Sequence, residues 1–335
     1  MADKVIQSFY ASIKPYTLEK PERKPKQNYV SILILRELQS AARFTTDGTE
    51  ANSSIIRIGD EEVTVGKLFG RKQVASDRRI AKALQRDLIA EKMNSFYKKG
   101  GWSGCSMEVT KMCQKCPECA LFGSAASEGD MSVTSRVMYD EAYTIRGINS
   151  VVEEYFQNAP GDDYAKKATS GIREPDFFKE GTLFPCVVTL RDVTCEEVLF
   201  FLNITDRNTR YGATGTRFGK TRNHILGVFA SNREGPSSLE ISRGVALRLA
   251  GGDEVRLPDS ESLKRVLELD SLPLHDVKKN ALEVYQHLLK THRISGIDLG
   301  ESEVTALLEA MKDDAVIKKI LITQIEKISD FLADQ

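Results

Sequence analysis

The sequence predicts an α+β fold whose C-terminal quarter is a small helical cap. Three observations lead to this prediction. Runs of branched apolar residues with the length of a strand recur along the chain up to about Leu249. A basic segment with apolar residues at helical spacing interrupts them, and from Ser262 onward the apolar residues again recur at helical intervals. At 335 residues the chain is long enough for about two domains, or for one domain with large insertions.

The first part of the chain predicts a central strand, a hairpin and a long helix. Residues 29–38 form an almost unbroken apolar run, which is typical of a strand buried on both faces. Two shorter runs, 55–58 and 63–65, flank a Gly-Asp pair and predict a hairpin. Ser76 is a candidate cap for a helix that continues to about Tyr97, with apolar residues four apart on one face and several bases elsewhere.

Later segments complete the predicted core. Four of them are apolar or alternate between apolar and polar residues, and these predict strands. The predicted strands are residues 133–145, 186–190, 225–230 and 239–249. Residues 196–203 predict a short helix, and the polar stretch 151–181 predicts a long excursion from the core.

Charge is distributed unevenly along the chain. Residues 301–335 carry eight acids and four bases, a net charge of −4, so the preceding residues carry +3 within a total of −1. Residues 67–99 hold ten bases against three acids, and residues 207–222 hold five bases and no acid. Because the local field attracts a polyanion more than the overall sum does, nucleic acid is a candidate partner despite the near-neutral total.

The composition argues against a membrane protein. Hydrophobic residues make up 41% of the chain and charged residues 28%, which is typical of a soluble globular protein. No apolar run approaches the roughly 18 residues that span a bilayer, and the chain begins without the apolar stretch of a signal peptide. We therefore expect a cytoplasmic protein with no membrane partner.

Four of the six cysteines lie close together in the sequence, at Cys105, Cys113, Cys116 and Cys119. Thiolates separated by two residues can reach one ion from a tight turn, and four sulfurs complete a closed tetrahedral shell with no position for water. The spacing therefore predicts a structural zinc site. The alternative is that these are ordinary reduced cysteines without a metal.

Residues 207–222 interleave glycines, aromatic residues and bases. Glycine lets the backbone approach a phosphate closely, the bases supply positive charge, and Tyr211 and Phe218 offer faces for unstacked nucleobases. The segment therefore predicts a groove for single-stranded nucleic acid. The alternative is a solvated basic loop with no partner.

Two catalytic interpretations are disfavoured. Residues 215–221 are similar to the phosphate loop of an ATPase, but three residues instead of four separate the two glycines, and no confident helix comes after them. The four histidines are scattered, so they do not suggest a catalytic set, and His224 is the only one close to the basic segment.

Three segments carry a resemblance to a known family. They are the first strand with the loop after it, YVSILILRELQSAARF; the end of the cysteine cluster with the strand region after it, CPECALFGSAASEGDMSVTSRVMYDEAY; and the glycine-rich segment RYGATGTRFGKTRNHILGVF. In this order they resemble the CRISPR-associated RAMP superfamily, and within it the backbone subunit, of the seventh Cas family, of the type I-D Cascade interference complex. The resemblance covers most of residues 28–250.

The resemblance implies a domain organisation. The core would be a ferredoxin-like palm, similar to an RNA-recognition fold, with an inserted zinc-knuckle finger region, a thumb excursion and the C-terminal helical cap. The implied boundaries are residues 1–66, 131–150 and 182–250 for the palm, 67–130 for the fingers, 151–181 for the thumb and 251–335 for the C-terminal helical region.

The resemblance also implies a function in antiviral defence. Such a subunit coats CRISPR RNA, polymerises with further copies of itself into a helical filament, and presents the guide for pairing with target DNA beside other type I-D Cascade subunits. Such a subunit must bind the RNA backbone independently of the base sequence. The candidate basic contacts are Arg43, Arg71, Lys72, Arg207, Arg210, Arg217, Lys220 and Arg222.

An enzyme is the alternative. Related backbone subunits of type III complexes cut target RNA through an aspartate in the loop after the first strand, where Asp47 stands in this chain. A lone carboxylate does not define a metal-dependent site, and a RAMP endonuclease that processes precursor RNA would need a general base such as His224. We therefore expect a binding subunit without catalytic activity.

Overall fold

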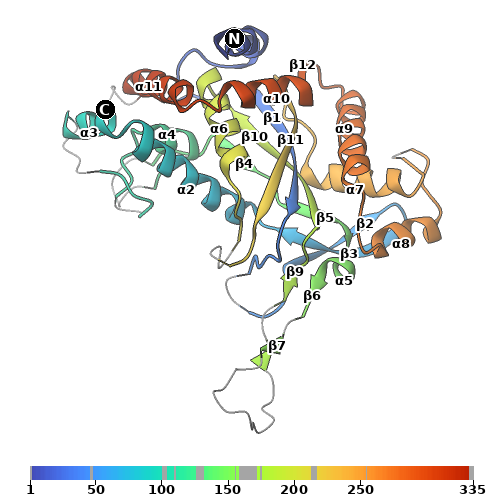
Figure 1. Ribbon diagram of the computed structural model, residues 1–335. Helices are drawn as coiled ribbons and strands as arrows, with labels where there is room; N and C mark the ends of the chain where they lie inside the picture. The colour runs from blue at the N-terminus through green and yellow to red at the C-terminus, as the bar shows by residue number, and fades with distance from the viewer. Residues whose placement is uncertain are drawn as a thin grey trace, which may run out of the picture.

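The computed structural model describes residues 2–45, 48–99, 104–108, 111–125, 132–154, 156–157, 172–173, 176–212, 217–253 and 255–331. Helices and antiparallel sheets alternate along this part of the chain (Figure 1). The predicted α+β class is confirmed.

A five-stranded antiparallel sheet forms the centre of the molecule. Its strand order is β12-β11-β1-β10-β4. The strands are β1 (Tyr29–Leu38), β4 (Val137–Tyr139), β10 (Leu183–Arg191), β11 (Thr221–Ser231) and β12 (Gly296–Leu299). β1 lies between β10 and β11, where Val30 is paired with Leu190 on one side and Ala230 on the other. The prediction of a central strand buried on both faces is confirmed, because nearly every residue of β1 is buried.

A second antiparallel sheet has the order β2-β3-β5, with β2 (Ser53–Ile58), β3 (Glu61–Leu68) and β5 (Ala142–Gly147). β2 and β3 form the predicted hairpin. Two short ladders come later in the chain, and their strands are β6 (Val152–Glu153) with β9 (Phe177–Phe178) and β7 (Phe156–Gln157) with β8 (Ile172–Arg173). Most of the predicted excursion, residues 155, 158–171 and 174–175, lies outside the described residues.

Helices cover both faces of the central sheet (Figure 1). They are α1 (Ala2–Ile13), α2 (Gly70–Leu88), α3 (Ala90–Lys99), α4 (Pro117–Phe122), α5 (Ile148–Val151), α6 (Cys195–Arg207), α7 (Ser238–Leu249), α8 (Ser260–Glu268), α9 (Leu274–Thr291), α10 (Glu301–Ala310) and α11 (Asp314–Phe331), with a 3₁₀ turn at Lys14–Tyr16. Because side chains alternate along a strand, Ile32 and Ile34 of β1 join one core with α1, α2, α4, α6, α10 and α11. Leu33 and Leu35 join a second core with α7, α8, α9 and the β2-β3-β5 sheet.

One predicted strand is wrong, because residues 239–249 lie in helix α7. The signal that decides the helix is a capping box at its start. The Glu240 amide donates to Ser237 Oγ at 3.3 Å, and the Ser237 amide donates to Glu240 Oε2 at 2.8 Å. These bonds satisfy two of the amides that a helix start leaves unpaired.

Other boundaries also differ from the predictions. The helix expected over residues 76–97 is two helices, α2 and α3, and α2 already begins at Gly70, so Ser76 is an interior residue. The strand expected over 133–145 is divided between β4 and β5, which belong to different sheets. The C-terminal region is helical as predicted, but it also supplies β12 to the central sheet. Within the described part of the chain, every helix is too short or too polar to cross a bilayer.

Candidate nucleic-acid interface and cysteine cluster

A buried polar network lies at the end of β1 where the basic segments meet. Arg36 of β1 is fully buried. Its Nη1 donates to the Tyr211 hydroxyl at 2.5 Å and to Asn223 Oδ1 at 2.7 Å, and its Nε donates to Gln73 Oε1 at 3.2 Å. The guanidinium also lies over the Tyr211 ring, 4.4 Å from the centroid. A buried cation is stable only with such partners.

Asp77 of α2 completes the network from the other side of Tyr211 and is also fully buried. It accepts hydrogen bonds from the Tyr211 hydroxyl at 2.8 Å, the Tyr139 hydroxyl at 2.6 Å and Asn208 Nδ2 at 2.6 Å. Burial together with the Asp77 charge raises the pKa of the Tyr211 hydroxyl well above its ordinary value, so this hydroxyl stays protonated and donates to Asp77.

The network corrects the prediction for Tyr211. Its side chain is 1% exposed, so the ring offers no face to a nucleobase. The signal for this was Arg36, a cation inside the apolar run of β1, because a cation there needs polar partners from elsewhere in the chain.

Two glycines of the basic segment serve packing within the protein. Gly212 and Gly219 have positive φ angles of +98° and +77°. A Cβ on Gly212 would lie 2.4 Å from the Arg43 carbonyl oxygen, and one on Gly219 would lie 2.0 Å from the Tyr211 carbonyl oxygen. Only glycine fits such close approaches. They were predicted to admit a phosphate, but at these two positions the space is taken by the chain's own backbone, and Gly215 lies outside the described residues.

Backbone contacts hold the segment after β1 against the segment before β11. The Gly219 amide donates to the Ala41 carbonyl oxygen at 2.8 Å, and the Lys220 amide donates to Ser40 Oγ at 3.0 Å. The first turns of α2 join them, since Ser76 Oγ donates to the Arg210 carbonyl oxygen. Segments far apart in sequence therefore meet at one end of the central sheet.

Seven of the predicted basic residues belong to these segments, and we call them the basic surface. It consists of Arg43, Arg71, Lys72, Arg210, Arg217, Lys220 and Arg222, of which Arg71, Arg217, Lys220 and Arg222 are exposed and the others are half-buried. Arg210 Nη1 donates to the Phe218 carbonyl oxygen at 3.2 Å.

Two further predicted contact residues, Arg207 and Phe218, have partners elsewhere in the chain. Arg207 is engaged by the C-terminal helix, because its Nη2 lies 2.5 Å from Asp314 Oδ1 of α11. Phe218 is half-buried, and its ring lies against that of Phe177 with the centroids 4.5 Å apart. The Arg217 guanidinium lies 5.5 Å from the Phe218 ring centroid. Phe218 therefore remains the stacking candidate of the segment.

The four cysteines predicted as metal ligands come together. Their Sγ atoms all lie within 4.8 Å of one another. The amides of Cys113, Cys116 and Cys119 donate to the sulfurs of Cys105, Cys113 and Cys116 at 3.2, 3.3 and 3.4 Å. Such N–H···S bonds stabilise thiolates, and four thiolates this close can hold a metal ion such as zinc.

Lys82 of α2 is a member of this site that the sequence did not suggest. Its side chain is 4% exposed, and Nζ lies 2.7 Å from Cys105 Sγ, 3.4 Å from Cys116 Sγ and 2.6 Å from Glu118 Oε2. Burial acts to lower the pKa of Lys82, but the Cys116 thiolate and the Glu118 carboxylate outweigh it and raise this pKa. A buried ammonium beside the sulfurs offsets the negative charge that four thiolates leave around a divalent ion.

Only one of the two residues named for catalysis lies within the described part of the chain. His224 Nε2 lies 2.9 Å from Glu37 Oε2 on the neighbouring strand, and burial lowers the pKa of His224. Asp47 lies outside the described residues.

Comparison with known proteins gives a family model and a fold. The Csc2 CRISPR family model matches residues 15–323 of the chain. The crystal structure of Thermofilum pendens Csc2 matches with a TM-score of 0.64 at 17% identity, covering 98% of this chain and 98% of that one. A chain of a CRISPR RNA-guided surveillance complex, pre-nicking, matches with a TM-score of 0.52 at 12% identity, covering 88% of this chain and 100% of that one. No curated protein matches. At these identities the structural likeness shows a common fold.

The network makes a prediction for stability. Tyr211→Phe removes one hydroxyl, so that Arg36 and Asp77 each lose one of their buried hydrogen bonds, and we expect a loss of about 1–3 kcal/mol in the free energy of unfolding. Urea denaturation followed by circular dichroism measures it. Tyr29→Phe, at a half-buried position on the same sheet, is the control and should change stability by less than about 0.5 kcal/mol. Equal effects would contradict the role of the network.

The cysteine cluster makes a prediction for metal content. We expect about one zinc ion per purified chain, because four converging thiolates form a closed site. Cys116→Ser should abolish it, and Lys82→Met should weaken zinc binding about tenfold, the order of effect of residues that support a ligand shell. Elemental analysis and competition with a chelating dye measure both.

The matched controls are Cys195→Ser, a cysteine outside the cluster, and Arg79→Met, which removes an exposed base from the same helix. Both should keep the zinc of the unaltered chain. A metal-free protein, or equal loss in Arg79→Met, would contradict the assignment.

Proposed function

The chain belongs to the Csc2 CRISPR family, and from this premise we propose that it is the subunit that binds the guide RNA along the backbone of a CRISPR interference complex. The observation that carries the proposal is the basic surface. The segment before β11 is packed against the segment after β1 at Gly212, and it leads to the exposed cations Arg217, Lys220 and Arg222. Cations held on a fixed protein backbone can bind the phosphates of a nucleic acid and leave its bases free to pair.

The order of the central strands supports a ferredoxin-like palm. β1, α2, β4, β10, α6 and β11 occur in this order along the chain, and their strands have the spatial order β11-β1-β10-β4. This is the βαββαβ arrangement of that fold. In this proposal the palm comprises residues 1–66, 131–150 and 182–250, the fingers with the zinc knuckle comprise 67–130, and 151–181 form the thumb.

The charge distribution supports assembly with further copies. The C-terminal helices expose acids such as Glu303 and Asp313, which lie on other elements than the cations of the basic surface. Opposite charges on different surfaces favour a head-to-tail contact, which repeats into a filament when it does not close. We propose that such copies cover the CRISPR RNA, present it to target DNA and contact the other subunits of a type I-D Cascade in the cytoplasm.

The proposed role is not enzymatic. If the cysteine cluster holds zinc, four sulfur ligands close the metal shell, so that the ion fixes the fingers and provides no position for a reacting water. The basic surface would then contribute affinity alone. Each phosphate contact adds to affinity in a way that falls with salt and does not select a sequence.

The proposal predicts a charge-dependent RNA affinity. The double substitution Arg217→Glu and Lys220→Glu should weaken binding of single-stranded RNA at low salt by about a hundredfold, and should reduce the slope of log affinity against log salt by about two, since two phosphate contacts are lost. Fluorescence anisotropy at several salt concentrations measures both quantities.

The control carries the same change of charge elsewhere. Lys264 and Arg265 of α8 are exposed and lie on the second core's side of the molecule. Their double substitution by glutamate should leave the slope unchanged. If both double variants lose affinity equally, the basic surface is not the binding site.

A further inference from the structure

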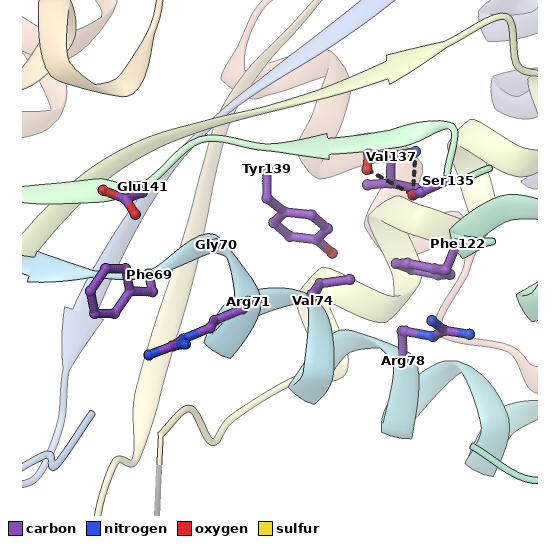
Figure 2. A pocket seen from close by; sticks show the side chains of 10 residues that line it. All are labelled: Phe69, Gly70, Arg71, Val74, Arg78, Phe122, Ser135, Val137, Tyr139 and Glu141. Atoms are coloured by element: carbon purple, nitrogen blue, oxygen red, sulfur yellow. Dashed lines mark hydrogen bonds between the residues drawn. The ribbon is translucent and has the colours of Figure 1, made fainter. Parts of the chain in front are cut away.

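An open groove of about 740 Å³ runs between the first turns of α2 and the edge strand β4 (Figure 2). Its apolar walls are Phe69, Val74, Phe122 and Tyr139, and Arg71 lies at one end. In Figure 2 the Tyr139 ring lies between Phe69 and Phe122 and points toward Val74. The volume falls within the roughly 300–1,000 Å³ of sites that hold small ligands.

The groove is closed to a peptide that would extend the sheet. The outward amide of Val137 donates to Ser135 Oγ at 3.2 Å, and Ser135 Oγ donates to the Val137 carbonyl oxygen at 2.9 Å, as drawn in Figure 2. Gly70 covers the next position, because even a Cβ there would lie 2.9 Å from the Tyr139 carbonyl oxygen. An added strand needs these backbone groups, so the occupant must be held by side chains.

The side chains that remain are aromatic and cationic. The Phe69 ring is half-buried, with the Arg71 guanidinium 4.8 Å and Lys67 Nζ 4.5 Å from its centroid. The one acid of the lining, Glu141, lies 3.3 Å from Lys67 Nζ, which offsets its charge. Arginines beside aromatic faces are the combination that holds unstacked nucleobases.

These walls are fixed before any ligand arrives. The hydroxyl of Tyr139 donates to the buried Asp77 at 2.6 Å. Arg78, at the far end of the groove, donates to Glu118 Oε1 at 2.5 Å and to the Gly123 carbonyl oxygen at 2.8 Å. Rigid walls lower the entropic cost of binding.

The groove is continuous with the basic surface. Arg71 belongs to both, and the part of α2 that lines the groove with Val74 also bonds the backbone of Arg210, through Ser76 two residues later. A strand whose phosphates lie along the basic surface would therefore pass the mouth of the groove.

We propose that the groove between α2 and β4 receives an unstacked base of a single-stranded nucleic acid whose phosphates lie on the basic surface. The inference rests on the proposed function and adds a second kind of contact to it. Phosphate contacts would supply affinity that falls with salt. Base stacking in the groove would add affinity that does not depend on salt and tolerates any base sequence.

The test compares an intact single-stranded RNA of about a dozen nucleotides, a length that spans one binding site of this kind, with the same strand carrying abasic sites. The unaltered chain should bind the intact RNA about tenfold more tightly, since stacking of one base has about that effect. Val74→Trp, which fills the groove, and Phe69→Leu, which removes a wall, should both bind the intact strand about tenfold more weakly and should no longer distinguish the two strands. Ala83→Trp, at an exposed position of α2 away from the groove, should behave as the unaltered chain does.

The outcomes separate this inference from the proposed function. If the unaltered chain binds neither strand at low salt, the proposed function itself fails. If it binds both strands equally, or if Val74→Trp and Ala83→Trp are alike, RNA binding stands and the groove inference is overturned. If Val74→Trp changes the oligomeric state in sedimentation and leaves the preference for bases intact, the occupant is a protein segment and the inference is also overturned. Thermal unfolding confirms that each variant is folded.

Discussion

The arrangement of this molecule depends on the buried charge of Arg36. A guanidinium in the middle of a sheet must be matched by polar groups, because an unpaired buried ion costs several kcal/mol. Here the match comes from Tyr211, Asn223 and Gln73, with Asp77 one hydrogen bond further on. Each of these partners lies on a different element. The hydrogen bonds of the one guanidinium therefore hold α2, β11 and the segment between α6 and β11 in place relative to β1.

The same helix is held at a second point, by the cysteine cluster. α2 buries polar side chains along one face, with Gln73 and Asp77 toward the network around Arg36 and Lys82 and Gln85 toward the sulfurs. The opposite face of the helix carries exposed arginines. Anchoring at both points holds these cations in place, so a strand of RNA would meet a surface that needs little reorganisation. The cysteine cluster and the buried network around Arg36 thus both orient this basic helix.

The sequence predicts those features whose cause is local. The strands at 29–38 and 186–190 are confirmed because a strand buried on both faces must be continuously apolar, and the cysteine cluster is confirmed because close spacing in sequence implies closeness in space. The prediction for residues 239–249 is wrong because their alternation competes with a capping box. The burial of Tyr211 and Lys82 could not be predicted, because it depends on partners far away in the chain. The RNA contacts and the domain boundaries stay predictions.

The most direct measurement is the RNA affinity of Asp77→Asn, a variant that removes no cation and makes the chain more positive. If the network positions the basic surface, this variant should bind single-stranded RNA about tenfold more weakly at a fixed salt concentration, although its added positive charge favours a polyanion. Affinity that is unchanged or tighter, in a variant whose circular dichroism spectrum matches that of the unaltered chain, would contradict the account.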